Sequence, residues 1–261
     1  MNTQTLNLLH KIYKEGESDM DSKLLILEKL LYLTVDYLET GEATNSLAFE
    51  FSDLSFEFLE KIHSKTLEVV DQDISDPEVQ LIVKSIDFLW FPLTKKYINK
   101  DYKIREIQIK IYNNLICMYR HAGYFNLALK IIALAEKLQE EDDLSNESLL
   151  KNRISTLLNK SVILSEVFSH DKAIYEIKQA ISLLEQFYKI INITKNENFD
   201  EEIKEYNHLK MVSHFNLAVE CEYLYKKEEA ISFYKISKQL AIENNNEELK
   251  IKCINALKKI K

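Results

Sequence analysis

Apolar residues recur along most of this chain at the spacing i, i+3, i+4 and i+7. This spacing gathers them on one side of a helix, because an α-helix completes a turn every 3.6 residues. Runs that alternate apolar and polar residues, which would predict strands, are nearly absent. The 261 residues include only 3 Gly and 2 Pro, so few positions suit tight hairpins or phosphate-binding loops. The pattern therefore predicts an all-α protein whose helices are joined by short polar turns.

The first hundred residues contain about four amphipathic stretches. They cover residues 6–13, 24–38, 47–70 and 76–89. Gly41 follows the second stretch as a C-cap residue, and Asp76 with Pro77 suits the N-cap and first position of the fourth helix. Pro92 is expected to interrupt that helix, because a mid-helix proline removes a hydrogen bond. We therefore expect a helical N-terminal region over residues 1–104.

The second part of the chain repeats one arrangement of residues three times, near 109–142, 154–187 and 211–244. Each unit combines large apolar residues in a first helix, a turn, and two small residues that flank a large one in a second helix. The shared slots hold Tyr112, Leu115, Tyr119, Gly123, Ala128, Ile132 and Ala135; then Leu157, Asn159, Ser161, Leu164, Ala173, Ile177 and Ala180; then His214, Asn216, Leu217, Ala218, Ala230, Tyr234 and Ser237. The small residues predict close helix packing.

This arrangement resembles the tetratricopeptide repeat (TPR), and it is similar to degenerate TPR proteins of ciliated protists. The resemblance covers residues 105–261 and implies a helical-hairpin repeat array, a TPR-like α-solenoid, after the helical N-terminal region. The chain departs from the family pattern in three slots: Lys160 replaces a leucine, while Phe168 and Tyr225 replace the turn glycine.

The repeats are spaced more widely than the family length of about 34 residues. We therefore expect polar insertions at 139–149 and 192–202, which project from one edge of the array as longer helices and loops. A last helix over 247–260 is expected to cover the exposed end, as repeat arrays require.

The resemblance also implies a protein-binding groove that is lined by the first helix of each unit. Carried onto this sequence, the groove slots are Lys110, Asn113, Cys117 and Arg120; then Leu158, Val162 and Ser165; then Phe215, Val219, Glu222 and Tyr223. The first unit has the Lys, Asn and Arg side chains of a carboxylate clamp, whereas the other two favour an apolar peptide or a partner helix. Two alternatives stay open: the N-terminal helices fill the groove, or these residues belong to the core.

Charge and composition exclude several classes of function. The net charge of -8 disfavours nucleic acid, because phosphate contacts need clustered Lys and Arg. The three cysteines and six histidines form no metal-ligand spacing, and Cys117, Cys221 and Cys253 suit reduced core thiols. The few glycines allow no nucleotide-binding or nucleophile-elbow motif, so we expect no catalysis, cofactor or small-molecule substrate. No apolar run suits a signal peptide or a membrane span, which predicts a cytoplasmic protein.

The leading hypothesis is a non-catalytic scaffold that binds several proteins within one large complex. The resemblance extends this hypothesis to a structural component of the ciliary axoneme and its cytoskeleton. The alternative is a peptide-sensing TPR regulator of the bacterial quorum-sensing type, although the acidic N-terminus makes a poor DNA-binding helix-turn-helix.

Overall fold

The computed structural model describes residues 102–140, 146–195 and 197–260, with scattered positions between 63 and 79. The helices expected in the first hundred residues and the proline interruption lie largely outside the described residues, as do residues 141–145 of the insertion expected at 139–149. The chain divides into two compact units, 1–118 and 119–261. Helix α5 crosses this boundary, and the helices that follow it belong to the second unit.

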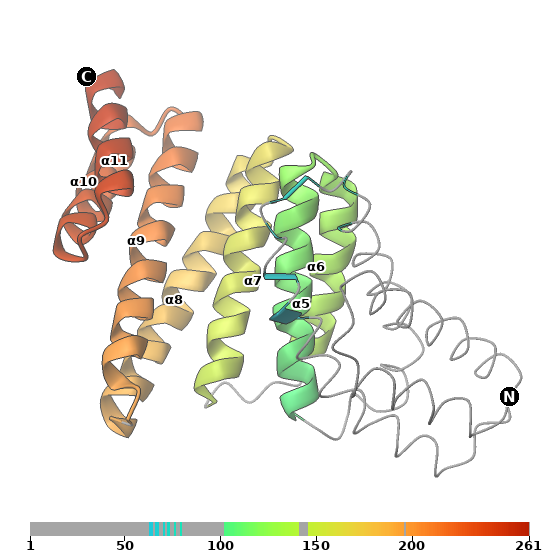
Figure 1. The fold of residues 1–261 in the computed structure, drawn as a ribbon. Helices are drawn as coiled ribbons and strands as arrows, with labels where there is room; N and C mark the ends of the chain where they lie inside the picture. Colours follow the sequence, from blue (N-terminus) through green and yellow to red (C-terminus); the bar gives the residue numbers. More distant parts are fainter. Residues whose placement is uncertain are drawn as a thin grey trace, which may run out of the picture. The chain divides into compact units, whose positions relative to one another are not determined.

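The described part of the chain contains seven helices and no strand, which confirms the all-α prediction (Figure 1). The helices are α5 (Tyr102–His121), α6 (Phe125–Gln139), α7 (Glu147–Glu166), α8 (His170–Thr194), α9 (Phe199–Tyr223), α10 (Lys227–Glu243) and α11 (Glu247–Ile260). The bounds of α11 match those expected for the last helix.

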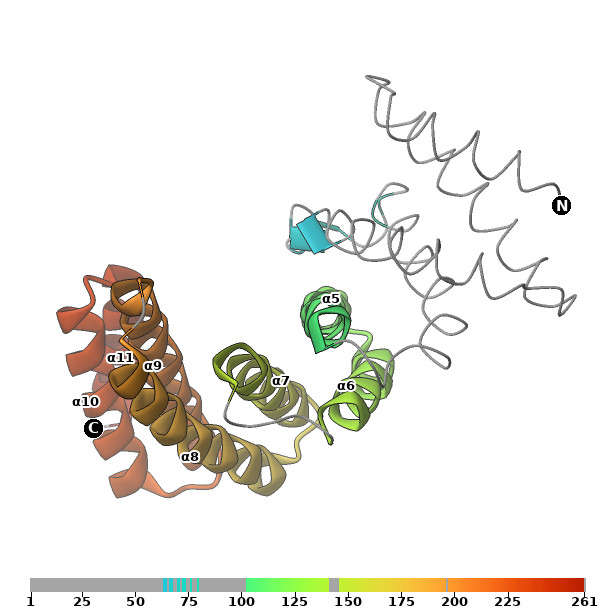
Figure 2. The ribbon, with the colours of Figure 1, turned by 90° about the horizontal axis from the view of Figure 1, so that it is seen from below.

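Helices of the second unit pack mainly against their neighbours in the chain. Contacts join α6 to α7, α7 to α8, α8 to α9, α9 to α10 and α10 to α11, with a smaller contact between α7 and α9. Figure 2 shows these helices from below, where α6, α7, α8 and α9 follow in chain order and α10 and α11 lie together beyond α9. Because three-residue links join α7 to α8, α9 to α10 and α10 to α11, each of these pairs forms an antiparallel hairpin.

Two apolar clusters form the core of the second unit. The α7–α9 core consists of Leu150, Ile154, Leu158, Ala180, Leu184, Phe187, Ile191 and Tyr206. The α8–α11 core consists of Ile174, Ile177, Leu217, Ala218, Cys221, Ala230, Tyr234 and Cys253. The first half of α8 belongs to one core and its second half to the other. Of the three cysteines predicted as core thiols, Cys221 and Cys253 are buried and Cys117 is half-buried. Burial raises the pKa of the Cys221 and Cys253 thiols.

The small residues of the second helices are fully buried. Each has 0% of its surface exposed: Ala128, Ala135, Ala173, Ala180, Ala230 and Ser237. The large residues between them, Ile132, Ile177 and Tyr234, are at most 2% exposed. Ser237 takes an alanine slot without leaving its hydroxyl unsatisfied, because the Oγ donates to the Met211 carbonyl at 3.0 Å.

Lys160, which replaces a leucine, joins three helices by charge. Its Nζ lies 2.6 Å from Oε1 of Glu136 on α6 and 2.9 Å from Oε1 of Glu176 on α8. Burial alone would lower the pKa of Lys160, but the hydrogen bonds that its Nζ donates to the two carboxylates outweigh burial and leave that pKa raised. At this position, ion pairs therefore replace the apolar contact that a leucine of the tetratricopeptide pattern would make.

The hairpin turns share one backbone conformation. Each has a residue with a positive φ: Gly123 (74°), Phe168 (59°), Tyr225 (58°) and Asn245 (54°). In the second of these turns the Phe168 N–H donates to the Ser165 carbonyl at 2.9 Å, and the Ser169 N–H donates to the Leu164 carbonyl at 2.7 Å. The other three turns repeat this pair of bonds, which is the Schellman pattern for ending a helix. Phe168 and Tyr225 thus adopt the conformation that glycine prefers.

Replacing Tyr225 with glycine should stabilise the protein. A left-handed conformation costs a residue with a side chain about 1–2 kcal/mol, and glycine removes this strain. Part of the stabilisation is lost again, because glycine also increases the conformational entropy of the unfolded chain. Tyr225 is 94% exposed, so little packing is lost. We expect Tyr225→Gly to raise the free energy of unfolding by up to about 1 kcal/mol in urea titrations. Tyr225→Ala is the control, because it removes the ring and keeps the strain; equal stability of both variants would contradict this account.

Enlarging a buried alanine should have the opposite effect. Ala173→Leu places three extra carbons into a fully buried contact, so we expect a loss of about 1–3 kcal/mol from overpacking. Thermal unfolding followed by circular dichroism measures the change. Lys172→Leu serves as the control, since Lys172 is the exposed neighbour on the same helix. If both variants melt at the wild-type temperature, helix α8 does not approach its neighbour closely at Ala173.

Candidate functional site

The groove residues predicted on α5 fall in different surroundings. Lys110 is paired with Glu106 one turn earlier, at 2.6 Å between Nζ and Oε1. Asn113 is buried and Cys117 is half-buried. Arg120 is half-buried, and its Nη2 lies 2.8 Å from Nε2 of His121. The lysine and the arginine of the predicted clamp therefore already have polar neighbours within the chain.

The predicted residues on α7 and α9 divide into core and surface. Leu158 is only 7% exposed and belongs to the α7–α9 core. Phe215 and Val219 are half-buried against the α8–α11 core, and the ring of Phe215 meets Tyr234 edge-on at 5.6 Å. Val162 is half-buried on α7.

Three polar or aromatic residues complete the predicted set. Ser165 is half-buried near the end of α7. Glu222 is exposed, and its Oε2 accepts a hydrogen bond from the Tyr234 hydroxyl at 2.9 Å. Burial, followed by this bond, raises the pKa of Tyr234. Tyr223 is 56% exposed.

Five of the predicted residues lie on two neighbouring helices, because α7 packs against α9. We call these residues the first-helix face: Val162, Ser165, Phe215, Val219 and Tyr223.

A histidine fixes the orientation of Tyr223 at one end of this face. The ring of His170, at the start of α8, stacks on Tyr223 with centroids 4.4 Å apart and planes 10° from parallel. His170 Nδ1 lies 2.8 Å from Oε2 of Glu220, whose side chain is only 4% exposed. Phe168 meets the same imidazole edge-on at 6.3 Å and is 83% exposed. The cluster therefore holds one face of the tyrosine ring against protein while much of Tyr223 remains exposed to a ligand.

Sequence reasoning missed this cluster. His170 and Glu220 are far apart in the chain, and neither belongs to a short motif. The available signal was indirect: His170 directly follows the turn of the predicted repeat near 154–187, and Glu220 lies in the first helix of the predicted repeat near 211–244. Packing between these two predicted repeats would bring the two residues together.

The two predicted insertions meet at the opposite end of the helices. The Thr194 hydroxyl at the end of α8 donates to Oε1 of Glu147 at the start of α7, at 3.0 Å. Just beyond both insertions, Lys151 of α7 lies 2.8 Å from Glu205 of α9. Burial raises the pKa of Glu147; the Thr194 bond opposes this shift, while the nearby Glu202 carboxylate reinforces it.

Comparisons with known proteins found no match. No family model, no curated protein and no solved structure matches it. Among the described helices, none combines the length and the apolar character that crossing a bilayer requires. The described residues also contain no group of three His, Cys, Asp or Glu side chains arranged to hold a metal ion.

The contact between Glu147 and Glu202 predicts a pH-dependent stability. Because the folded-state pKa of Glu147 lies above its unfolded value, the folded state binds the proton more tightly. Stability therefore rises as pH falls from neutrality through the interval between those two pKa values. We expect Glu202→Gln to raise the urea midpoint at pH 7 and to reduce the gain on acidification.

The matched control for this experiment is Glu201→Gln. Glu201 is an exposed carboxylate in the same first turn of α9, so its loss changes the helix-end charge equally. If both variants shift the midpoint alike at pH 7 and pH 5, the pairing of Glu147 with Glu202 contributes nothing to stability.

Proposed function

We propose that this chain is a TPR-like α-solenoid that acts as a non-catalytic protein-binding scaffold. One observation carries the proposal: a turn residue of positive φ is followed at the same three offsets by buried small, large and small residues. The three sets are Gly123 with Ala128, Ile132 and Ala135; Phe168 with Ala173, Ile177 and Ala180; and Tyr225 with Ala230, Tyr234 and Ser237. Three hairpins built to one plan support a repeat architecture, in which each hairpin needs its neighbours to bury its apolar face.

The first-helix face supports protein binding as the use of this architecture. Val162, Phe215 and Val219 keep part of their apolar surface exposed, and Phe215 and Val219 also pack against the α8–α11 core. Tyr223 adds an aromatic ring whose position is fixed by His170 and Glu220. Rigid aromatic and aliphatic side chains lose little entropy on binding and serve as anchors for a peptide or a partner helix.

The wider setting of the proposal rests on resemblance alone. Degenerate TPR proteins of ciliated protists suggest a structural role in a large assembly such as the axoneme, with several protein partners in the cytoplasm. Under this proposal the chain binds neither nucleic acid, membrane nor small-molecule substrate. A short signal peptide as the sole ligand would favour the quorum-sensing type of regulator instead.

The test compares two exposed tyrosines. Tyr223 is 56% exposed on the first-helix face, and Tyr175 is 62% exposed on α8. Complexes purified with tagged chain from its source and identified by mass spectrometry should lose most partner protein with Tyr223→Ala combined with Val162→Ser. Tyr175→Ala should retain the partners, and circular dichroism should show equal helix in both variants. Unchanged partners in the double variant would refute this face as the binding site.

A buried member of the predicted groove distinguishes core from surface. Leu158→Asp places a charge without a partner into the α7–α9 core, so we expect loss of helical signal and of cooperative unfolding. If Leu158→Asp remained folded and lost only its partners, Leu158 would belong to the binding face.

A further inference from the structure

The outer face of α6 exposes apolar side chains in the second unit. Ala128, Ile131, Ile132 and Ala135 of this helix are buried. Yet Leu127 is 42% exposed and Leu134 is 40% exposed. A helix that is apolar on most of its circumference is normally covered on most sides. Of the other described helices in this unit, α7 is the one that packs substantially on α6.

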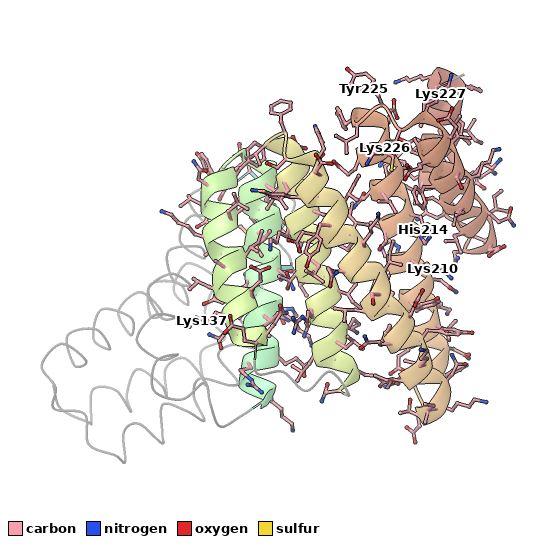
Figure 3. The ribbon with its side chains drawn as sticks, turned by 180° about the vertical axis from the view of Figure 1, so that it is seen from behind. Lys137, Lys210, His214, Tyr225, Lys226 and Lys227 are labelled. Carbon is pink, nitrogen blue, oxygen red and sulfur yellow. The ribbon has the colours of Figure 1, made fainter. Side chains whose placement is uncertain are left out.

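The exposed residues of α6 follow a seven-residue spacing. Leu127 and Leu134 are two turns apart, and Lys130 and Lys137 repeat the same separation. All four fall within one side of the helix, because seven residues nearly complete two turns. Both lysines are exposed, and Lys137 extends outward in Figure 3. A two-turn stripe of leucine and lysine is the pattern that one helix offers to another laid along it.

The charge of this face is opposite to that of the chain. The chain carries a net charge of -8. Glu136, the acidic residue within α6, is bound by Lys160 at 2.6 Å, so its charge is compensated. In the described part of the chain, neither Lys130 nor Lys137 forms an ion pair with a carboxylate. The stripe is therefore apolar along its centre and positive at its side.

We propose that the outer face of α6 binds an acidic amphipathic helix of a partner protein. Leu127 and Leu134 take the apolar stripe of that helix, and Lys130 and Lys137 pair with carboxylates flanking it. Two lysines are too few for a nucleic acid, whose binding needs many phosphate contacts. A membrane surface needs a broader apolar face with more cations. This surface is distinct from the first-helix face, so the inference stands apart from the proposed function.

The experiment uses two synthetic helical peptides with the same leucine stripe. One carries glutamate at every flanking position and the other carries lysine. Fluorescence anisotropy with the full chain should show roughly tenfold tighter binding of the glutamate peptide, because two exposed ion pairs replace two repulsive contacts. Lys130→Glu combined with Lys137→Glu should reverse the preference.

Three controls separate the possible results. Lys178→Glu combined with Lys189→Glu changes the charge equally on exposed positions of α8 and should leave the preference unchanged. Leu127→Ser with Leu134→Ser should weaken binding of the glutamate peptide at constant circular dichroism. Tyr223→Ala should leave peptide binding unaltered, so failure here would not affect the scaffold proposal.

Several outcomes would overturn the inference. Equal affinity for both peptides, or a preference unaffected by the α6 lysines, would remove the charge complementarity. Unfolding of the leucine variant would show that the leucines lie within the fold. Sedimentation of the chain with phosphatidylserine vesicles through Lys130 and Lys137, without peptide binding, would assign the face to a membrane.

Discussion

The left-handed residue that ends the first helix of each hairpin is the constraint on which the packing of the second unit depends. It turns the chain back within three residues, and the following helix then begins at a fixed phase. At that phase Ala173 and Ala230 are fully buried, and we expect a larger side chain at either position to overpack its surroundings. Phe168 and Tyr225 hold this conformation at an energetic cost that glycine would avoid. The described hairpin turns therefore share one backbone conformation, whether the residue that adopts it is glycine, asparagine or aromatic.

Local features of this fold could be predicted from the sequence, and contacts between distant residues could not. Helical period, turn slots and small residues all express constraints within about twenty residues, so the all-α class and the bounds of α11 followed from the pattern. The role of Lys160 could not be predicted from the sequence, because it depends on ion pairs with Glu136 and Glu176, which lie on two other helices. The pairing of His170 with Glu220 could not be predicted for the same reason.

The same difference between local and distant contacts applies to the predicted groove residues. Sequence slots identify which residues lie on the first helices, but they do not fix how far each side chain sinks between α7 and α9. Leu158 and Val162 are one turn apart on α7, yet the former is core and the latter keeps part of its surface exposed. Tyr223 stays exposed because its ring rests on His170 rather than between helices. Depth of burial is a property of the assembled helices.

Helix α8 couples the two cores of the second unit, because it contributes residues to both. Its first half completes one core and its second half completes the other, so the two cores share a single continuous rod of 25 residues. Fraying that begins at either core must bend or melt this rod before it can proceed, which couples the two events. Helices α7 to α11 should then open as one cooperative block, whereas linear repeat proteins with weaker coupling can lose hairpins singly from an end. Force applied at one core would reach the other core through the same helix.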